Sequence, residues 1–61
     1  MEKFIKQFGR PIAKQSATKI EYRGFSDLDR VHMQAVRLLD TLGIGYSIEK
    51  NPQLKGFTIY F

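Results

Sequence analysis

The chain contains no cysteine and no tryptophan, and its only histidine is His32. Without cysteine there is neither a disulfide framework nor a thiolate metal site. His32 has no second histidine, cysteine or carboxylate at ligand spacing, so we expect no metal and no cofactor. It falls within the apolar stripe of a predicted helix, which is typical of a half-buried packing residue.

Long apolar runs are also missing. The longest uncharged run is Thr41 to Ile48, far short of the ~20 apolar residues that a transmembrane helix needs. The chain begins Met1-Glu2-Lys3 and has no apolar segment of the kind found in a secretory signal. We therefore expect a cytoplasmic protein that does not bind membranes.

No catalytic motif is present. Nucleophilic catalysis needs a nucleophile, a base and an orienting group, and His32 has no such partners. Asp27 and Asp29 are two residues apart on the predicted helix and do not face each other. The segment Gly43-Ile44-Gly45 follows a helix and precedes a strand, which is the reverse of the order in a phosphate-binding loop. We expect no catalytic residues and predict that the protein is not an enzyme.

The length allows a single domain over residues 1–61. A chain of about 60 residues buries only about 60% of the surface that its unfolded state exposes. Ligand pockets occupy about 300–1,000 Å³, and so small an interior leaves little room for one. These limits favour a binding surface over a deep active site.

The clearest predicted element is a helix from Asp27 to Leu42. Ser26 precedes it as the expected N-cap, and Gly43 follows it where a left-handed residue ends many helices. Its apolar positions recur at the spacing of a 3.6-residue period. These positions are Leu28, Val31, His32, Ala35, Leu38, Leu39 and Leu42.

Alternating apolar residues predict three strands, over residues 18–23, 44–49 and 57–61, with residues 50–56 as a hairpin loop. The fold class is therefore α+β, with a βαββ core over residues 18–61. The last strand is the most apolar, so we place it in the middle of an antiparallel sheet. Residues 1–17 form a basic N-terminal segment. Within it, residues 1–8 fit a short helix or an extra edge strand, and residues 10–17 fit a loop.

The net charge is +4, and the excess lies in the first third of the chain. Residues 1–23 hold six of the ten lysines and arginines but only two of the six acidic residues. This asymmetry favours an anionic partner, either nucleic acid or an acidic protein surface, although solubility alone also selects such a charge. The predicted nucleic-acid-binding residues are Lys3, Lys6, Arg10, Lys14, Lys19, Arg23 and Tyr60.

Tyr60 is included because it falls on the sheet face that the helix does not cover. The alternation puts Lys19, Glu21, Arg23, Ser47, Glu49, Thr58 and Tyr60 on that face. RNA-binding sheets use exposed aromatic residues in this way. Residues 1–8 are the alternative cover for the same face.

A second function remains open, a small regulator or inhibitor that binds another protein, of the kind that phages direct at host factors. Its predicted contact residues are Arg30, Met33 and Arg37 on the outer side of the helix. Because one helix on three strands makes a thin layer, we also expect a homodimer, formed through residues 1–8 or through the sheet edges.

Overall fold

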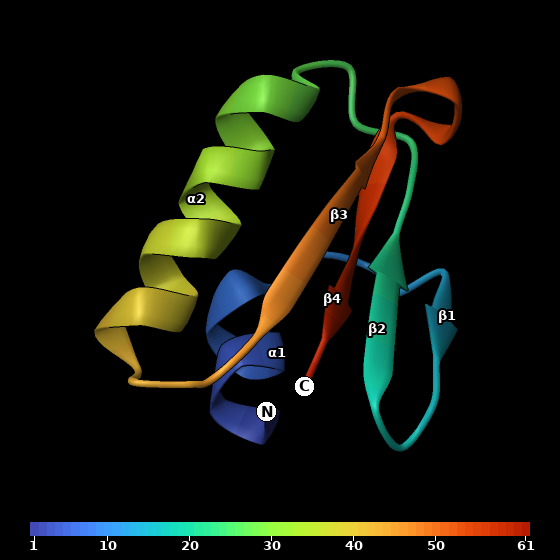
Figure 1. Ribbon diagram of the computed structural model, residues 1–61. Coiled ribbons are helices and arrows are strands. Elements are labelled where there is room, and N and C mark those ends of the chain that lie inside the picture. Colours follow the sequence, from blue (N-terminus) through green and yellow to red (C-terminus); the bar gives the residue numbers. More distant parts are fainter.

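The computed structural model describes all residues from Met1 to Phe61. It contains two helices that lie on the same side of a four-stranded antiparallel sheet (Figure 1). Along the chain the elements are α1 (Glu2–Phe8), β1 (Lys14–Gln15), β2 (Lys19–Tyr22), α2 (Leu28–Thr41), β3 (Ser47–Asn51), the 3-10 turn η1 (Pro52–Leu54) and β4 (Gly56–Tyr60). The predicted α+β class and βαββ core are confirmed.

The strand order is β1-β2-β4-β3, and every pairing is antiparallel. β4 lies between β2 and β3, as its apolar sequence predicts. The register aligns Ile20 and Ile48 with Ile59 on opposite sides of β4. Tyr22 is aligned with Phe57 in the same way. These residues give the sheet one apolar face, on which both helices pack.

Helix α2 buries Val31, Ala35 and Leu39, which lie four residues apart along one stripe. At its end Gly43 adopts a positive φ of 69°. The Gly43 N–H donates to the carbonyl of Asp40, and the Ile44 N–H donates to that of Leu39. This pair of bonds satisfies carbonyls that the helix leaves free, and it confirms the predicted helix end.

The helix start differs from the prediction. The N-cap is Asp27 rather than Ser26, and its side chain accepts no capping hydrogen bond. Instead the Asp27 carboxylate lies 3.9 Å from Arg30 Nε, while its backbone carbonyl accepts from the Val31 N–H. The Asp27 carboxylate therefore faces the Arg30 guanidinium, one turn along the helix, and does not accept from the free backbone amides.

Residues 1–8 contain the helix α1 and its N-cap Met1, and this helix packs on the apolar sheet face. Phe4 is fully buried, and its ring stacks on Phe8 at 5.1 Å between centroids. Phe8 in turn lies 5.0 Å from the ring of Tyr22. A helix keeps Phe4 and Phe8 on one side and leaves Lys6 in solvent, whereas a strand would turn Lys6 inward. The alternative in which this segment covers the second sheet face is therefore wrong.

Two predicted boundaries also change. Residues 10–17, predicted as a loop, contain the short strand β1, which β2 holds in place through backbone bonds from Ala13 to Glu21 and from Ser16 to Lys19. β3 begins at Ser47 instead of residue 44, because the Ile44 amide is used to close the end of α2. The fourth strand is thus β1 and not residues 1–8.

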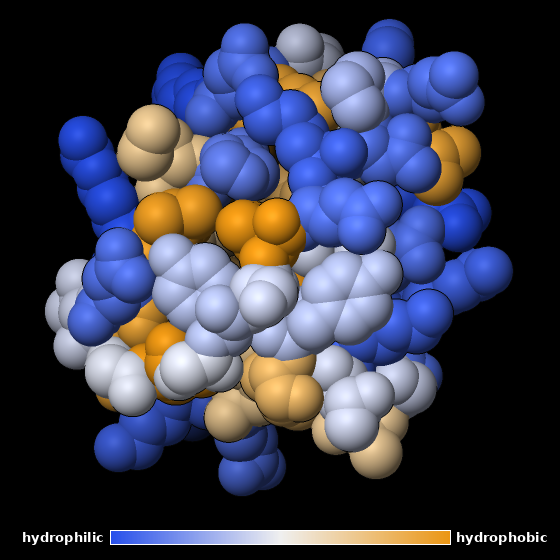
Figure 2. Space-filling model, viewed as in Figure 1, coloured by the Kyte–Doolittle hydropathy of each residue, from blue (hydrophilic) through white to orange (hydrophobic).

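The core consists of nine buried hydrophobic residues between the helices and the sheet: Phe4, Ile20, Tyr22, Phe25, Val31, Ala35, Leu39, Phe57 and Ile59. In the view of Figure 2, hydrophilic residues cover most of the surface and hydrophobic residues emerge in a few patches. The Tyr22 hydroxyl is buried without a hydrogen-bond partner. Burial raises the pKa of Tyr22 to about 12.

Candidate nucleic-acid interface

The sheet face turned away from both helices is uncovered, and we call it the open face. The strand register places one cross-strand row of Lys19, Tyr60 and Ser47 on it, and beside this a row of Lys14, Glu21, Thr58 and Glu49. Arg23 continues the same side of β2. All seven residues that the alternation predicts for this face are present, and Lys14 joins them because β1 extends the sheet.

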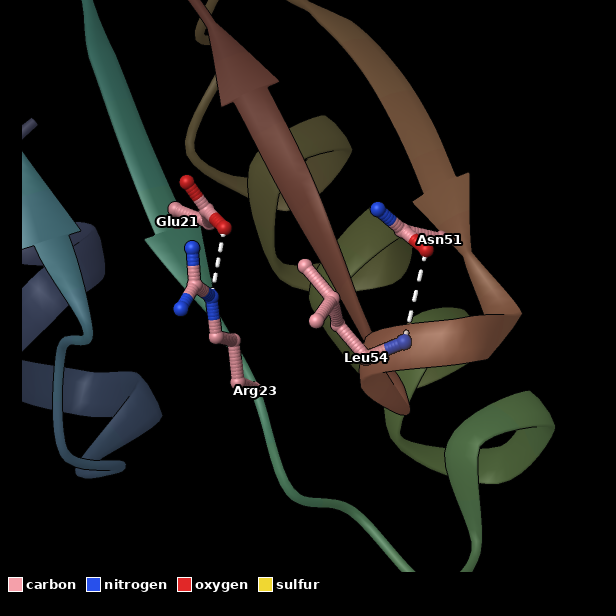
Figure 3. A network of polar contacts seen from close by, with 4 residues as sticks. All are labelled: Glu21, Arg23, Asn51 and Leu54. Atoms are coloured by element: carbon pink, nitrogen blue, oxygen red, sulfur yellow. Dashed lines mark hydrogen bonds and ion pairs between the residues drawn. The ribbon is translucent and has the colours of Figure 1, made fainter.

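Three cations surround one carboxylate on the β1–β2 side of the open face. Arg23 Nε donates to Glu21 Oε1 at 2.6 Å (Figure 3), and Lys14 lies opposite Glu21 in the register. The Arg23 hydrogen bond, together with the charges of Arg23, Lys14 and Lys19, lowers the pKa of Glu21. Three cations against one carboxylate leave an excess of positive charge there.

Tyr60 supplies an exposed aromatic ring at the C-terminal end of β4, a central strand of the sheet. Its relative exposure is 41%, and its neighbours in the row are Lys19 and Ser47. In the next row Thr58 lies between Glu21 and Glu49. The face is therefore positive along β1 and β2, aromatic and hydroxylic along β4, and acidic at Glu49 on β3.

Leu54 adds an apolar side chain that the sequence prediction missed. Its backbone N–H donates to the Asn51 side chain at 3.3 Å, and its carbonyl accepts from the Gly24 N–H. The first bond caps η1, and the second holds η1 against the segment after β2. The Leu54 side chain is 40% exposed and points from the turn toward Arg23 (Figure 3). Only the pairing of this turn with Gly24, which is not visible in the sequence pattern, brings Leu54 to this position.

The other predicted cations lie elsewhere. Lys3 and Lys6 are exposed on α1, in the helix layer. The Arg10 guanidinium lies 5.7 Å from the centre of the Phe25 ring, a cation–π distance. The structure therefore brings Lys14, Lys19 and Arg23 together with Tyr60 and separates them from Lys3, Lys6 and Arg10.

The predicted protein-contact residues share the outer surface of α2. Met33 is 51% exposed, and the Arg30 side chain is 75% exposed. Arg37 is also exposed, one turn beyond Met33. These three residues lie on the side of the helix opposite its buried stripe.

His32 is partly buried, as predicted, with its ring edge-on to Phe57 at 5.7 Å. Burial is the main cause that lowers the pKa of His32, and the charge of Lys50 adds to it. Lys50 Nζ donates to Asp29 Oδ1 at 2.6 Å, which joins β3 to α2. His32 is thus a packing residue beside an ion pair.

The side chains do not bring together three or more histidines, cysteines or carboxylates in an arrangement able to hold a metal ion. Neither helix has both the length and the apolar character required to cross a bilayer. Comparisons with protein families, with curated proteins and with solved structures found no match to this chain.

Proposed function

We propose that the protein is a non-enzymatic accessory factor that binds nucleic acid through the open face. The observation that supports this proposal is the grouping of Lys14, Lys19 and Arg23 beside the exposed ring of Tyr60 on an uncovered sheet face. Cations attract phosphates, and an exposed aromatic ring can stack on a base. Groups suited to both kinds of contact lie on this one surface.

In this proposal Lys3 and Lys6 on α1 attract the nucleic acid from a distance and do not contact it. Lys3 and Lys6 lie in the helix layer, so they do not contact a ligand that lies on the open face. Because charges in solvent are largely screened beyond about 10 Å at 0.1 M salt, these lysines contribute general attraction only at low ionic strength. The proposal therefore assigns direct phosphate contacts to Lys14, Lys19 and Arg23.

Fluorescence anisotropy at low salt, with single-stranded and double-stranded labelled probes, tests the proposal. Log K should fall with log salt concentration by about 0.7–0.9 for each neutralised phosphate. Absence of binding to every probe at tens of micromolar protein would refute nucleic-acid binding.

A pair of matched variants tests the surface itself. Lys14→Gln/Lys19→Gln removes two charges from the open face, and Lys3→Gln/Lys6→Gln removes two from α1. The first variant should weaken binding and flatten the salt dependence, because phosphate contacts are lost. The second should change binding much less. Equal losses would show that net charge matters and that the open face is not the site.

The second candidate function, a regulator that binds an acidic protein surface, is supported by the exposure of Met33 between two arginines on α2. A pull-down from nuclease-treated cell extract tests it with the wild type and with Met33→Glu/Arg37→Glu. A partner that is retained by the wild type and lost by the variant supports this function. If nuclease treatment removes every partner, the regulator function is wrong.

The homodimer stays a prediction. Because α1 packs on its own chain, pairing at the sheet edges is the remaining route, and β3 is the longer edge. Lys50 on that edge faces the helix layer and binds Asp29, an inward charge of the kind that discourages strand pairing. Light scattering at physiological salt decides the matter, since a mass near 7.1 kDa would refute the dimer.

A further inference from the structure

We propose that the open face binds a single-stranded polynucleotide in preference to a duplex, an inference that rests on the proposed function. The ring of Tyr60 is exposed in the middle of a row of side chains. In a duplex the bases are stacked inside and present only their edges in the grooves, whereas an unpaired base offers its flat side to a ring. Neither helix lies on this face, so it presents no helix that could enter a major groove.

The distribution of charge across the face gives a second, independent reason. Lys14, Lys19 and Arg23 lie around the single carboxylate of Glu21 on β1 and β2, or directly after β2, so this side keeps a net positive charge, whereas Glu49 lies across β4 on β3. A duplex carries phosphates on both of its strands, and a duplex lying across the sheet would bring one row of them toward Glu49. A single strand can place its only row of phosphates along the cations and direct its bases over β4, where Tyr60 lies.

The spacing of the cations indicates how much of the strand is contacted. Lys19, Glu21 and Arg23 occupy alternate positions of one chain segment, and alternate residues of a strand are about 6.6–6.8 Å apart. The Cα atoms of Lys19 and Arg23 are therefore separated by about 13 Å along the sheet, which is an upper limit for the two charges because Arg23 bonds back to Glu21. A stacked strand advances about 3.4 Å per nucleotide, so we expect a footprint of about four nucleotides, at the lower end of known single-strand sites.

Anisotropy titrations with labelled oligo-dT and oligo-U of increasing length, and with a duplex, test this inference on the wild-type protein. Affinity should rise steeply up to about four nucleotides and then only slowly, as additional equivalent positions become available. The duplex should bind more weakly than the longer single strands. Tighter binding of either oligonucleotide series than of the duplex supports the inference, and the ratio of the oligo-dT and oligo-U affinities reports the contribution of the 2′-hydroxyl groups.

Tyr60 is tested with a pair of variants that both keep a large apolar side chain on β4. Tyr60→Phe keeps an aromatic plane and should bind the single strand nearly as well as the wild type. Tyr60→Leu removes the plane and should weaken binding by about 5- to 150-fold, the effect of losing one stacked base. Circular dichroism confirms that both variants are folded.

The outcomes separate this inference from the proposed function. If the duplex binds as tightly as the single strands, or if Tyr60→Leu binds as well as Tyr60→Phe, the preference for single strands is wrong while nucleic-acid binding stands. If no probe binds, both proposals are wrong.

Discussion

Replacing Tyr22 with phenylalanine should make the protein more stable. The Tyr22 side chain is fully buried among phenylalanine rings, and its hydroxyl has no hydrogen-bond partner. A buried hydroxyl without a partner costs about 1–3 kcal/mol. Tyr22→Phe removes that oxygen and keeps the ring contacts, so the free energy of unfolding at neutral pH should rise by at least about 1 kcal/mol. For a domain of this size that corresponds to about 4–8 °C in Tm.

The advantage of the variant should increase in alkali. The pKa of Tyr22 is about 12 in the folded protein against 10.0 for the free side chain. Above pH 10 the unfolded chain therefore releases this proton before the folded chain does, so the stability of the wild type falls as the pH rises toward 12. At about pH 11 the loss amounts to one pKa unit, or about 1.4 kcal/mol, and Tyr22→Phe avoids it.

Urea unfolding followed by far-ultraviolet circular dichroism, at neutral pH and near pH 11, measures both effects. Tyr46→Phe is the matched control, because the Tyr46 hydroxyl donates to Asp40 Oδ1 at 3.2 Å and its removal should leave stability unchanged or slightly lower. A Tyr22→Phe protein that is less stable than the wild type would show that the hydroxyl is satisfied in solution. A stability difference that does not grow in alkali would refute the assignment of the raised pKa to burial.

Three further predictions concern folding. Because burial lowers the pKa of His32 below 6.5, the unfolded state takes up this proton first, so stability should fall as the pH drops through 6.5. Urea titrations of His32→Gln should show a smaller fall, and an equal fall would exclude His32 as the cause. A Cβ atom at Gly56 would lie 1.8 Å from the Tyr22 carbonyl oxygen, whereas Gly45 has open space; Gly56→Ala should therefore lose about 1–3 kcal/mol or more in a urea melt, and a stability equal to that of Gly45→Ala would contradict the crowding. Phe4→Ala should cost about 3–5 kcal/mol, comparable to the stability of so small a core, and should abolish the cooperative melt in circular dichroism; a midpoint like that of the wild type would show that α1 is not part of the core.

The elements that carry their own periodic signal could be predicted from the sequence. The stripe of α2 and its terminal glycine, and the alternation in β2 and β4, are properties of consecutive residues, and each was placed to within a few positions. The central position of β4 followed from its apolar character. The seven predicted residues of the open face followed from the same alternation.

The remaining features depend on contacts between distant segments. β1 has only two residues, and nothing in the sequence Lys14-Gln15 marks a strand. The strand forms because β2 offers hydrogen-bonding groups to this segment. The choice between helix and strand for residues 1–8 required knowing that Phe8 meets Tyr22. For the same reason the sequence could not show which of the six N-terminal cations lie on the open face and which lie elsewhere. The path of the chain after Gly9 sends Lys14 to the sheet and leaves Lys3 and Lys6 on α1.

The core lies entirely on one side of the sheet. Selection for stability therefore acts on that face, whereas selection on surface chemistry acts on the open face. None of the fully buried side chains belongs to the open face, and surface substitutions away from buried groups usually change stability by no more than about 0.5 kcal/mol. Mutations on the open face can therefore accumulate with little effect on folding, provided that strand-forming residues are kept on β4. A library randomised at the open-face positions of β2 and β4 would vary the chemistry of this surface while the scaffold stays the same, and evolution has the same freedom.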